Sequence, residues 1–190
     1  FSFSSNKQSH KNMDEGERLS NSLESMGTTF IKLGQFLATR PDIIGDELSK
    51  KLENLQDKLP PFSLSQAKAI IKNDLGDVTY NSIINLSEPV AAASIAQVHK
   101  AQINDNGTLK DVAIKILRPD IKKIFNEEID ALMLLAFLIE GTIKKTKRLK
   151  LVEVVFLLKE ITNLELDLRF EASAANEFLE NTKNDVGFNV

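Results

Sequence analysis

Cysteine is absent from this sequence of 190 residues, and histidine occurs only twice. Without cysteine the chain has no disulfide, no thiolate nucleophile and no cysteine-based metal site. His10 and His99 lie far apart in the sequence, so we expect no zinc site. We interpret His99 as a packed or half-exposed residue rather than a catalyst. The longest uninterrupted apolar run, from Ala131 to Ile139, is too short to span a bilayer. A net charge of −3 leaves no basic footprint for nucleic acid.

What remains is an ordinary globular composition. Hydrophobic residues make up 42% of the chain and charged residues 27%, which suffices to build a core. The chain begins with Phe rather than Met, and its first residues are rich in Ser and Asn. We therefore expect residues 1–14 to be a disordered or truncated leader of a longer protein. A helical region, 15–76, and a mixed region, 77–190, should follow it.

The region after the leader has helical periodicity. Apolar residues recur at helical spacing from Glu15 to Ala38, and Gly27 is expected to divide this stretch into two helices. Pro41 should stop the second helix, because it disfavours helix in the residue before it. A further helix is predicted over 44–55.

Another helix is bounded by signals at both ends. Pro60 and Pro61 impose an extended linker, after which Ser63 and Gln66 have the spacing of a capping box. Gly76 should end this helix as its C-terminal stop.

After Gly76 the pattern changes from helices to strands. Three short strands are predicted over 80–86, 97–103 and 112–117. Asn106–Gly107 lies between the last two and is a strong hairpin signal, because a type I′ turn needs positive φ at both positions. The sequence therefore predicts a small antiparallel sheet.

Helices are expected again after the sheet. One helix follows Arg118 and runs to about Ile139, where Gly141 should end it. A basic stretch, Lys144 to Lys150, leads to a long final helix over 151–180. We interpret the basic stretch as a solvated connector, with contact to anionic lipid as the alternative.

One segment of the mixed region carries recognisable chemistry. Val112–Ala113–Ile114–Lys115 is the strand-borne motif with which kinases hold the α/β-phosphates of ATP. Upstream, where a protein kinase has its glycine-rich loop, the four key positions are Ala91, Ala93, Ala96 and Val98. Glycine permits positive φ and close approach of backbone N–H groups to phosphate, whereas each alanine adds a Cβ atom. This loop should therefore be stiffer than a glycine loop and less able to wrap the γ-phosphate.

Three motifs in order resemble those of the UbiB family, the atypical kinase-like proteins of ubiquinone biosynthesis. TFIKLGQFLATRPD resembles the KxGQ motif, the alanine-rich AAAS resembles the replacement for the glycine loop, and ELDLRFEA resembles the ExD motif. The likeness runs from about Arg18 to the C-terminus. It implies an α+β fold: a protein-kinase-like N-lobe with a small antiparallel sheet, an N-terminal helical KxGQ extension (15–76) and an inserted helix (119–140). The sequence has no H-R-D or D-F-G pattern, so the C-lobe is expected to be absent.

The resemblance also implies roles for individual residues. Ala91, Ala92, Ala93, Ser94, Val98 and Lys115 should bind the nucleotide. Lys32, Gly34 and Gln35 form the KxGQ motif, in which Lys32 and Gln35 lie one helical turn apart and should disfavour a protein substrate. Glu165 and Asp167 match the ExD pair and should face the nucleotide and Lys32.

The ion-pair partner of Lys115 is open to two interpretations. Ordinary kinase spacing nominates Glu127 or Glu128, whereas the family resemblance treats the 119–140 helix as an insertion and nominates Glu171. We predict Glu171. Asp167 and Glu171 lie four apart on the predicted final helix, a like-charge pair that a nearby cation would have to compensate.

The function implied is that of an atypical kinase or ATPase that uses ATP and Mg²⁺ and supports ubiquinone biosynthesis. Its partners would be pathway proteins or lipid intermediates, with peripheral contact to a membrane. The location would be the bacterial inner membrane on its cytoplasmic side, or alternatively the matrix face of the mitochondrial one. The fragment alone should be inactive. A non-enzymatic nucleotide-sensing scaffold is the alternative, and a conventional protein kinase is disfavoured by the alanine loop and the KxGQ helix.

Overall fold

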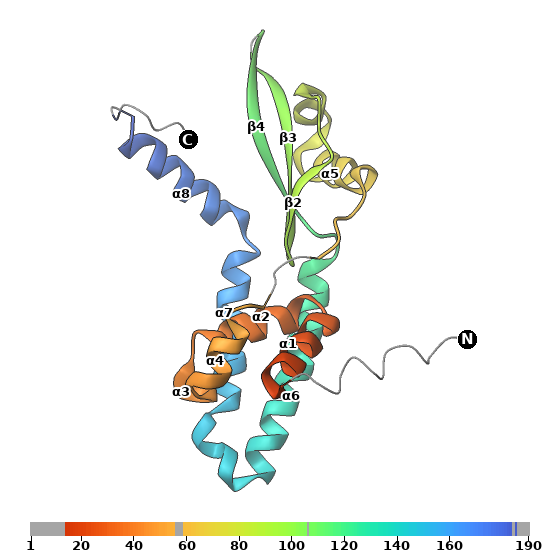
Figure 1. Ribbon diagram of the computed structural model, residues 1–190. Helices are drawn as coiled ribbons and strands as arrows, with labels where there is room; N and C mark the ends of the chain where they lie inside the picture. Colours follow the sequence, from red (N-terminus) through yellow and green to blue (C-terminus); the bar gives the residue numbers. More distant parts are fainter. Residues whose placement is uncertain (1–13, 56–58, 106, 184, 186–190) are drawn as a thin grey trace, which may run out of the picture. The chain divides into compact units, whose positions relative to one another are not determined.

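The computed structural model describes residues 14–55, 59–105, 107–183 and 185 (Figure 1). The predicted leader therefore lies outside the described residues except for Asp14, and so does Asn106 of the predicted hairpin turn. The chain divides into two compact units, 1–128 and 129–190, which are described separately.

Four helices form the N-terminal layer: α1 (Glu15–Met26), α2 (Thr28–Ala38), α3 (Pro41–Ile44) and α4 (Asp46–Leu52). Gly27 separates the first two helices as predicted, with a φ of 102° that favours glycine. The single helix predicted over 44–55 is wrong, because Gly45, with a φ of 85°, divides this stretch into α3 and α4. The layer is held together by a cluster of buried side chains, Leu23, Ile31, Leu52 and Leu55.

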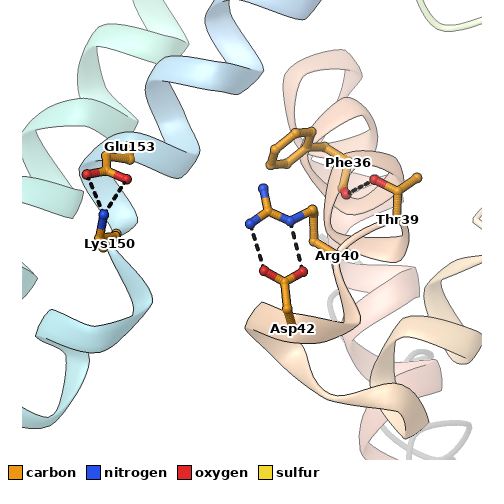
Figure 2. A network of polar contacts seen from close by, with 6 residues as sticks. All are labelled: Phe36, Thr39, Arg40, Asp42, Lys150 and Glu153. Atoms are coloured by element: carbon orange, nitrogen blue, oxygen red, sulfur yellow. Dashed lines mark hydrogen bonds and ion pairs between the residues drawn. The ribbon is translucent and has the colours of Figure 1, made fainter.

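The corner between α2 and α3 is fixed by polar contacts (Figure 2). The Arg40 guanidinium donates two hydrogen bonds to Asp42, from Nε at 2.9 Å and from Nη2 at 2.7 Å. The Thr39 hydroxyl donates to the Phe36 carbonyl at 2.8 Å, and the Arg40 Cζ atom lies 6.0 Å from the centre of the Phe36 ring. Helix α2 ends at Ala38 and α3 begins at Pro41, close to the helix end that the sequence predicts.

Helix α5 (Leu64–Ser82) follows the linker and carries the predicted capping box. The Ser63 side chain accepts from the Gln66 backbone N–H, and the Gln66 side chain accepts from that of Ser63. Gly76 interrupts the helix with φ 77°, as predicted, but helical turns resume up to Ser82. The strand predicted over 80–86 is therefore wrong apart from two residues, Ile83 and Ile84.

The sheet consists of β1 (Ile83–Ile84), β2 (Pro89–Ala92), β3 (Ala96–Asp105) and β4 (Thr108–Leu117). Strand β3 is central: β1 and β2 pair with one edge of it and β4 with the other, all antiparallel. The predicted hairpin is confirmed by the Asp105–Thr108 pair and by the positive φ of Gly107, 89°. Strand β2 was not predicted, because it lies in the segment that was expected to be a loop. Helix α5 packs on the sheet through Ala67, Ile71 and Ile116.

Helix α6 (Ile121–Thr142) begins in the first unit and continues into the second, past the predicted stop at Gly141. The second unit continues with η2 (Lys144–Leu149), α7 (Leu151–Glu165) and α8 (Leu168–Asn181). The Lys150 ammonium bonds both carboxylate oxygens of Glu153 at 3.0 Å, at the start of α7 (Figure 2). One continuous helix over 151–180 was predicted wrongly, because the chain breaks at Leu166–Asp167.

Gly34→Ala should lower the free energy of unfolding by about 1 to 2 kcal/mol, the cost of overpacking a core. A Cβ atom at Gly34 would lie 2.9 Å from Leu23 Cδ1 and 3.0 Å from Leu55 Cδ2, both in the buried cluster. This cost should exceed the gain in helix propensity, about 1 kcal/mol. The midpoint of urea unfolding, followed by circular dichroism, measures the effect.

Gly141→Ala is the matched control, because this glycine is also helical but nothing lies within 4 Å of the added Cβ atom. It should be neutral or slightly stabilising. Equal shifts of the midpoint in both variants would contradict the packing role of Gly34.

Candidate functional site

Three predicted nucleotide-binding residues lie in one row across the sheet. Ala91 of β2 pairs with Val98 of β3, and Val98 pairs with Lys115 of β4. Directly opposite residues of antiparallel strands project to the same face, so Ala91, Val98 and Lys115 share a face. Ala91 and Lys115 are exposed there, and Val98 is half-buried.

The opposite face of the same strands is buried against the linker and α5. Gln97 and His99 are both fully buried there. The Gln97 side chain accepts from the Phe62 N–H at 3.0 Å and donates to the Phe62 carbonyl at 3.2 Å. His99 Nδ1 lies 2.7 Å from the Ser87 carbonyl and must donate to it, so Nε2 accepts from Gln97 at 2.9 Å. His99 is thus a packing residue, as predicted.

The alanine-rich segment forms a tight hairpin turn rather than an open loop. Ala91 and Ala92 belong to β2, and the Ala93 N–H donates to the Ala96 carbonyl at 2.8 Å, which leaves only Ser94 and Ile95 at the tip. No residue from 91 to 98, all of them described, has a positive φ. Glycine's conformational freedom is therefore not needed for this turn, which explains how alanine can replace it. We refer to residues 93–96 as the alanine turn.

Helix α2 touches the alanine turn through its first residue. The Thr28 hydroxyl donates to the Ser94 carbonyl at 2.9 Å. Lys32 and Gln35 follow Thr28 by four and seven residues, so the three side chains share one face of the helix. The face that carries the predicted KxGQ residues is therefore the face that meets the alanine turn.

Gly34 lies on another side of α2 and is buried against Leu23 and Leu55. The KxGQ motif thus combines two half-buried polar residues on one face with a packing glycine on another.

The predicted ExD residues lie at the junction of α7 and α8. Glu165 is the last residue of α7, Asp167 is the N-cap of α8, and Glu171 is in the first turn of α8. Asp167 and Glu171 are therefore not neighbours on a continuous helix. The Asp167 carboxylate accepts from Arg169 Nε at 2.8 Å, and this hydrogen bond raises the pKa of Arg169 above its ordinary value.

The pairing of Lys115 with Glu171 stays a prediction, because the two residues belong to different units. Of the alternative partners on α6, Glu127 is exposed. Glu128 keeps one carboxylate oxygen buried without a hydrogen-bond partner in the described part of the chain.

Three residues that hold the site together were missed from the sequence: Thr28, Gln97 and Arg118. Gln97 lies within the predicted nucleotide segment, Arg118 follows it and Thr28 precedes the KxGQ motif. Their hydrogen bonds, however, go to backbone groups distant in sequence. A backbone partner has no sequence signature, so no pattern could have revealed these contacts.

Other site types find little support in the described residues. They contain no group of three or more histidine or carboxylate side chains that could hold a metal ion, and no helix among them is long and apolar enough to cross a membrane. A groove of about 510 Å³ is lined by residues that include Asp14, Glu17, Glu24 and Lys51. None of the predicted site residues lines this groove.

Comparisons with known proteins agree with the motifs. Residues 54–190 match the ABC1 atypical kinase-like domain. The chain is 39% identical over 173 residues to the "Probable protein kinase UbiB" of Marinobacter nauticus, which covers 90% of this chain and 31% of that protein. It is 38% identical to the protein of the same name from Aliivibrio fischeri, covering 87% of this chain and 30% of that protein. It is 36% identical to the protein of the same name from Vibrio cholerae, covering 92% of this chain and 32% of that protein.

The chain thus spans about a third of the length of these relatives. The domain match covers well over half of its residues, and the small antiparallel sheet with flanking helices has the composition of a kinase-like N-lobe. The chain therefore belongs to the UbiB family of ABC1 atypical kinase-like proteins.

Proposed function

We propose that this chain supplies the phosphate-binding part of an atypical kinase-like protein that binds ATP. The observation that carries the proposal is the row of Ala91, Val98 and Lys115 on the open face of the sheet, beside the tight alanine turn. A lysine on a strand behind a phosphate-facing turn is the arrangement with which kinases hold the α/β-phosphates. Small side chains at Ala91 and Val98 leave room on this face for the nucleotide.

The acidic residues have separate roles in this proposal. Glu171 pairs with Lys115 and positions its ammonium, while Glu165 and Asp167 face the nucleotide and Lys32. The sequence has no H-R-D or D-F-G pattern, so the ligands of Mg²⁺ would come chiefly from outside this chain. When bound, Mg²⁺ would neutralise charge on the phosphates.

The KxGQ helix would restrict the acceptor of the phosphoryl group. Lys32 and Gln35 share the face of α2 that meets the alanine turn, so they would occupy the space beside the terminal phosphate. A small or lipid-linked acceptor, or water, would fit there better than a peptide. We propose a role in ubiquinone biosynthesis at a membrane, on the cytoplasmic side in bacteria or the matrix side in mitochondria, with pathway proteins or lipid intermediates as partners.

A nucleotide-sensing scaffold is the second candidate function. Large apolar side chains are exposed on α6, α7 and α8 of the second unit, among them Leu134, Phe137, Phe156, Leu164 and Phe170. Such surfaces often mark contacts with other proteins. ATP turnover by the full-length protein distinguishes the two functions, because a scaffold would bind ATP without turning it over.

Lys115→Ala should lower ATP turnover of the full-length protein by orders of magnitude, because positioning and charge neutralisation dominate phosphoryl transfer. Lys100→Ala is the matched control: Lys100 is exposed, and its pairing with Ala113 places it on the same face as Lys115. Steady-state phosphate release measures both variants. Equal rates in the two variants would show that Lys115 is not part of the nucleotide site.

A double-mutant cycle, measured on ATP turnover by the full-length protein, identifies the ion-pair partner of Lys115. Lys115→Met combined with Glu171→Gln should show a coupling of about 1 kcal/mol or more, whereas Lys115→Met with Glu127→Gln or with Glu128→Gln should be additive. Coupling to Glu127 or Glu128, with none to Glu171, would overturn the assignment of the inserted helix.

Ala93→Gly should loosen the alanine turn and let its backbone approach phosphate more closely, because glycine widens the accessible backbone conformations. We expect altered affinity for ATP or ADP in the full-length protein, with the fold retained. Isothermal titration calorimetry measures the affinities, and circular dichroism checks the fold. Binding curves identical to the wild type would refute this role of the methyl group.

The isolated 190-residue chain should bind ATP weakly or not at all and should show no ATPase activity. It supplies the lysine and the turn, but the metal ligands and the residue that orients the acceptor would lie elsewhere. Turnover of ATP by the purified chain in the presence of Mg²⁺, abolished by Lys115→Ala, would show that the chain is sufficient.

A further inference from the structure

Arg118 follows β4 directly, and its side chain reaches back to the alanine turn. Nε and Nη2 donate to the Ala93 carbonyl at 3.0 and 2.8 Å. Nη1 donates to the Pro60 carbonyl at 3.0 Å, and Nη2 also donates to the Leu59 carbonyl at 3.2 Å. One planar guanidinium therefore joins the turn to the linker that leads from α4 to α5.

Three carbonyls of the turn accept hydrogen bonds from outside it, two from Arg118 and one from Thr28. Ala93 is held by the Arg118 side chain, Ser94 by the Thr28 hydroxyl and Ile95 by the Arg118 backbone N–H at 2.9 Å. Hydrogen bonds from a charged group to a carbonyl that is shielded from water are stronger than neutral ones. The turn therefore cannot shift without breaking hydrogen bonds to Arg118 and to the first residue of the KxGQ helix.

The contacts at position 118 require the geometry of arginine and not only a positive charge. Five N–H donors in a rigid fork can meet carbonyls on two chain segments at once, whereas a lysine ammonium is a single point on a flexible stem. Arg118 is half-buried, so loss of its side chain would leave the Ala93 carbonyl without its cationic donor.

We infer that Arg118 is a positioning residue for the nucleotide site and couples the alanine turn to the helical layer. This inference rests on the proposed function, since it assigns the turn to the phosphates. Arg118 acts through the Ala93 carbonyl and does not itself touch the nucleotide. By holding the turn closed, it fixes how near the backbone approaches the terminal phosphate and thereby sets the preference between ATP and ADP.

The experiment uses the full-length protein with Arg118→Gln, Arg118→Lys and the control Arg18→Gln, an exposed arginine on α1. Hydrogen–deuterium exchange reports on the Ala93 and Arg118 amides, whose acceptors are the Ala96 and Ile95 carbonyls. Exchange at these two amides should rise about tenfold in Arg118→Gln, the factor expected for loss of charge-assisted hydrogen bonds. Arg118→Lys should restore part of the protection, and Arg18→Gln should match the wild type.

Affinities for ATP and ADP, measured by calorimetry on the same variants, test the functional part. The ratio of the two dissociation constants should change about severalfold in Arg118→Gln and recover partly in Arg118→Lys, in step with the exchange. Unchanged exchange in a folded variant would overturn the positioning role, as would a rise spread evenly over the first unit. If Arg118→Gln fails to fold, Arg118→Lys decides the same question through its smaller, local change.

Failure of the inference and failure of the proposed function are distinguishable. A wild-type protein that binds no nucleotide would refute the proposed function, while the exchange data would still show whether Arg118 holds the turn. A mobile turn with an unchanged ATP-to-ADP ratio would refute the inference alone.

Discussion

The register of β3 depends on the buried hydrogen bonds between Gln97 and the backbone of Phe62. A slip by one residue would move every side chain of the strand to the other face. It would also take Gln97 away from Phe62 and leave buried polar groups unpaired, at a cost of several kcal/mol. Because Val98 is the next residue, it projects to the open face, where the pairing of β3 with β4 places it beside Lys115. A contact on the buried face thus helps to determine which side chains reach the proposed site.

Two different constraints act on the KxGQ helix, and they explain why its residues differ in kind. On one face, close packing against Leu23 and Leu55 leaves no space for a side chain, so position 34 is glycine. On another face, Thr28 is bonded to the alanine turn, which directs Lys32 and Gln35 toward the same region. The helix is thereby fixed both by its packed side and by its first residue.

Much of this organisation could be predicted from the sequence because it rests on local rules. The capping box at Ser63, the break at Gly27 and the hairpin at Gly107 are set by residues within a few positions of one another. The failures have different physical causes. Hydrophobic periodicity does not register a helix break without glycine or proline, so the interruption at Leu166–Asp167 was missed. Long-range bonds to backbone, such as those of Arg118, cannot be predicted from any sequence pattern.

The break between α7 and α8 changes how the ExD residues can act. Asp167 caps α8, and its carboxylate is bonded to Arg169, whose side chain is 90% exposed. An ion pair with so exposed a partner adds little to stability, so another cation could displace Arg169 readily. Asp167 itself is only 23% exposed, and its position is held by the cap rather than by the ion pair. A carboxylate fixed by the backbone and paired with an exposed arginine can exchange that partner for another cation without rearrangement of the helix.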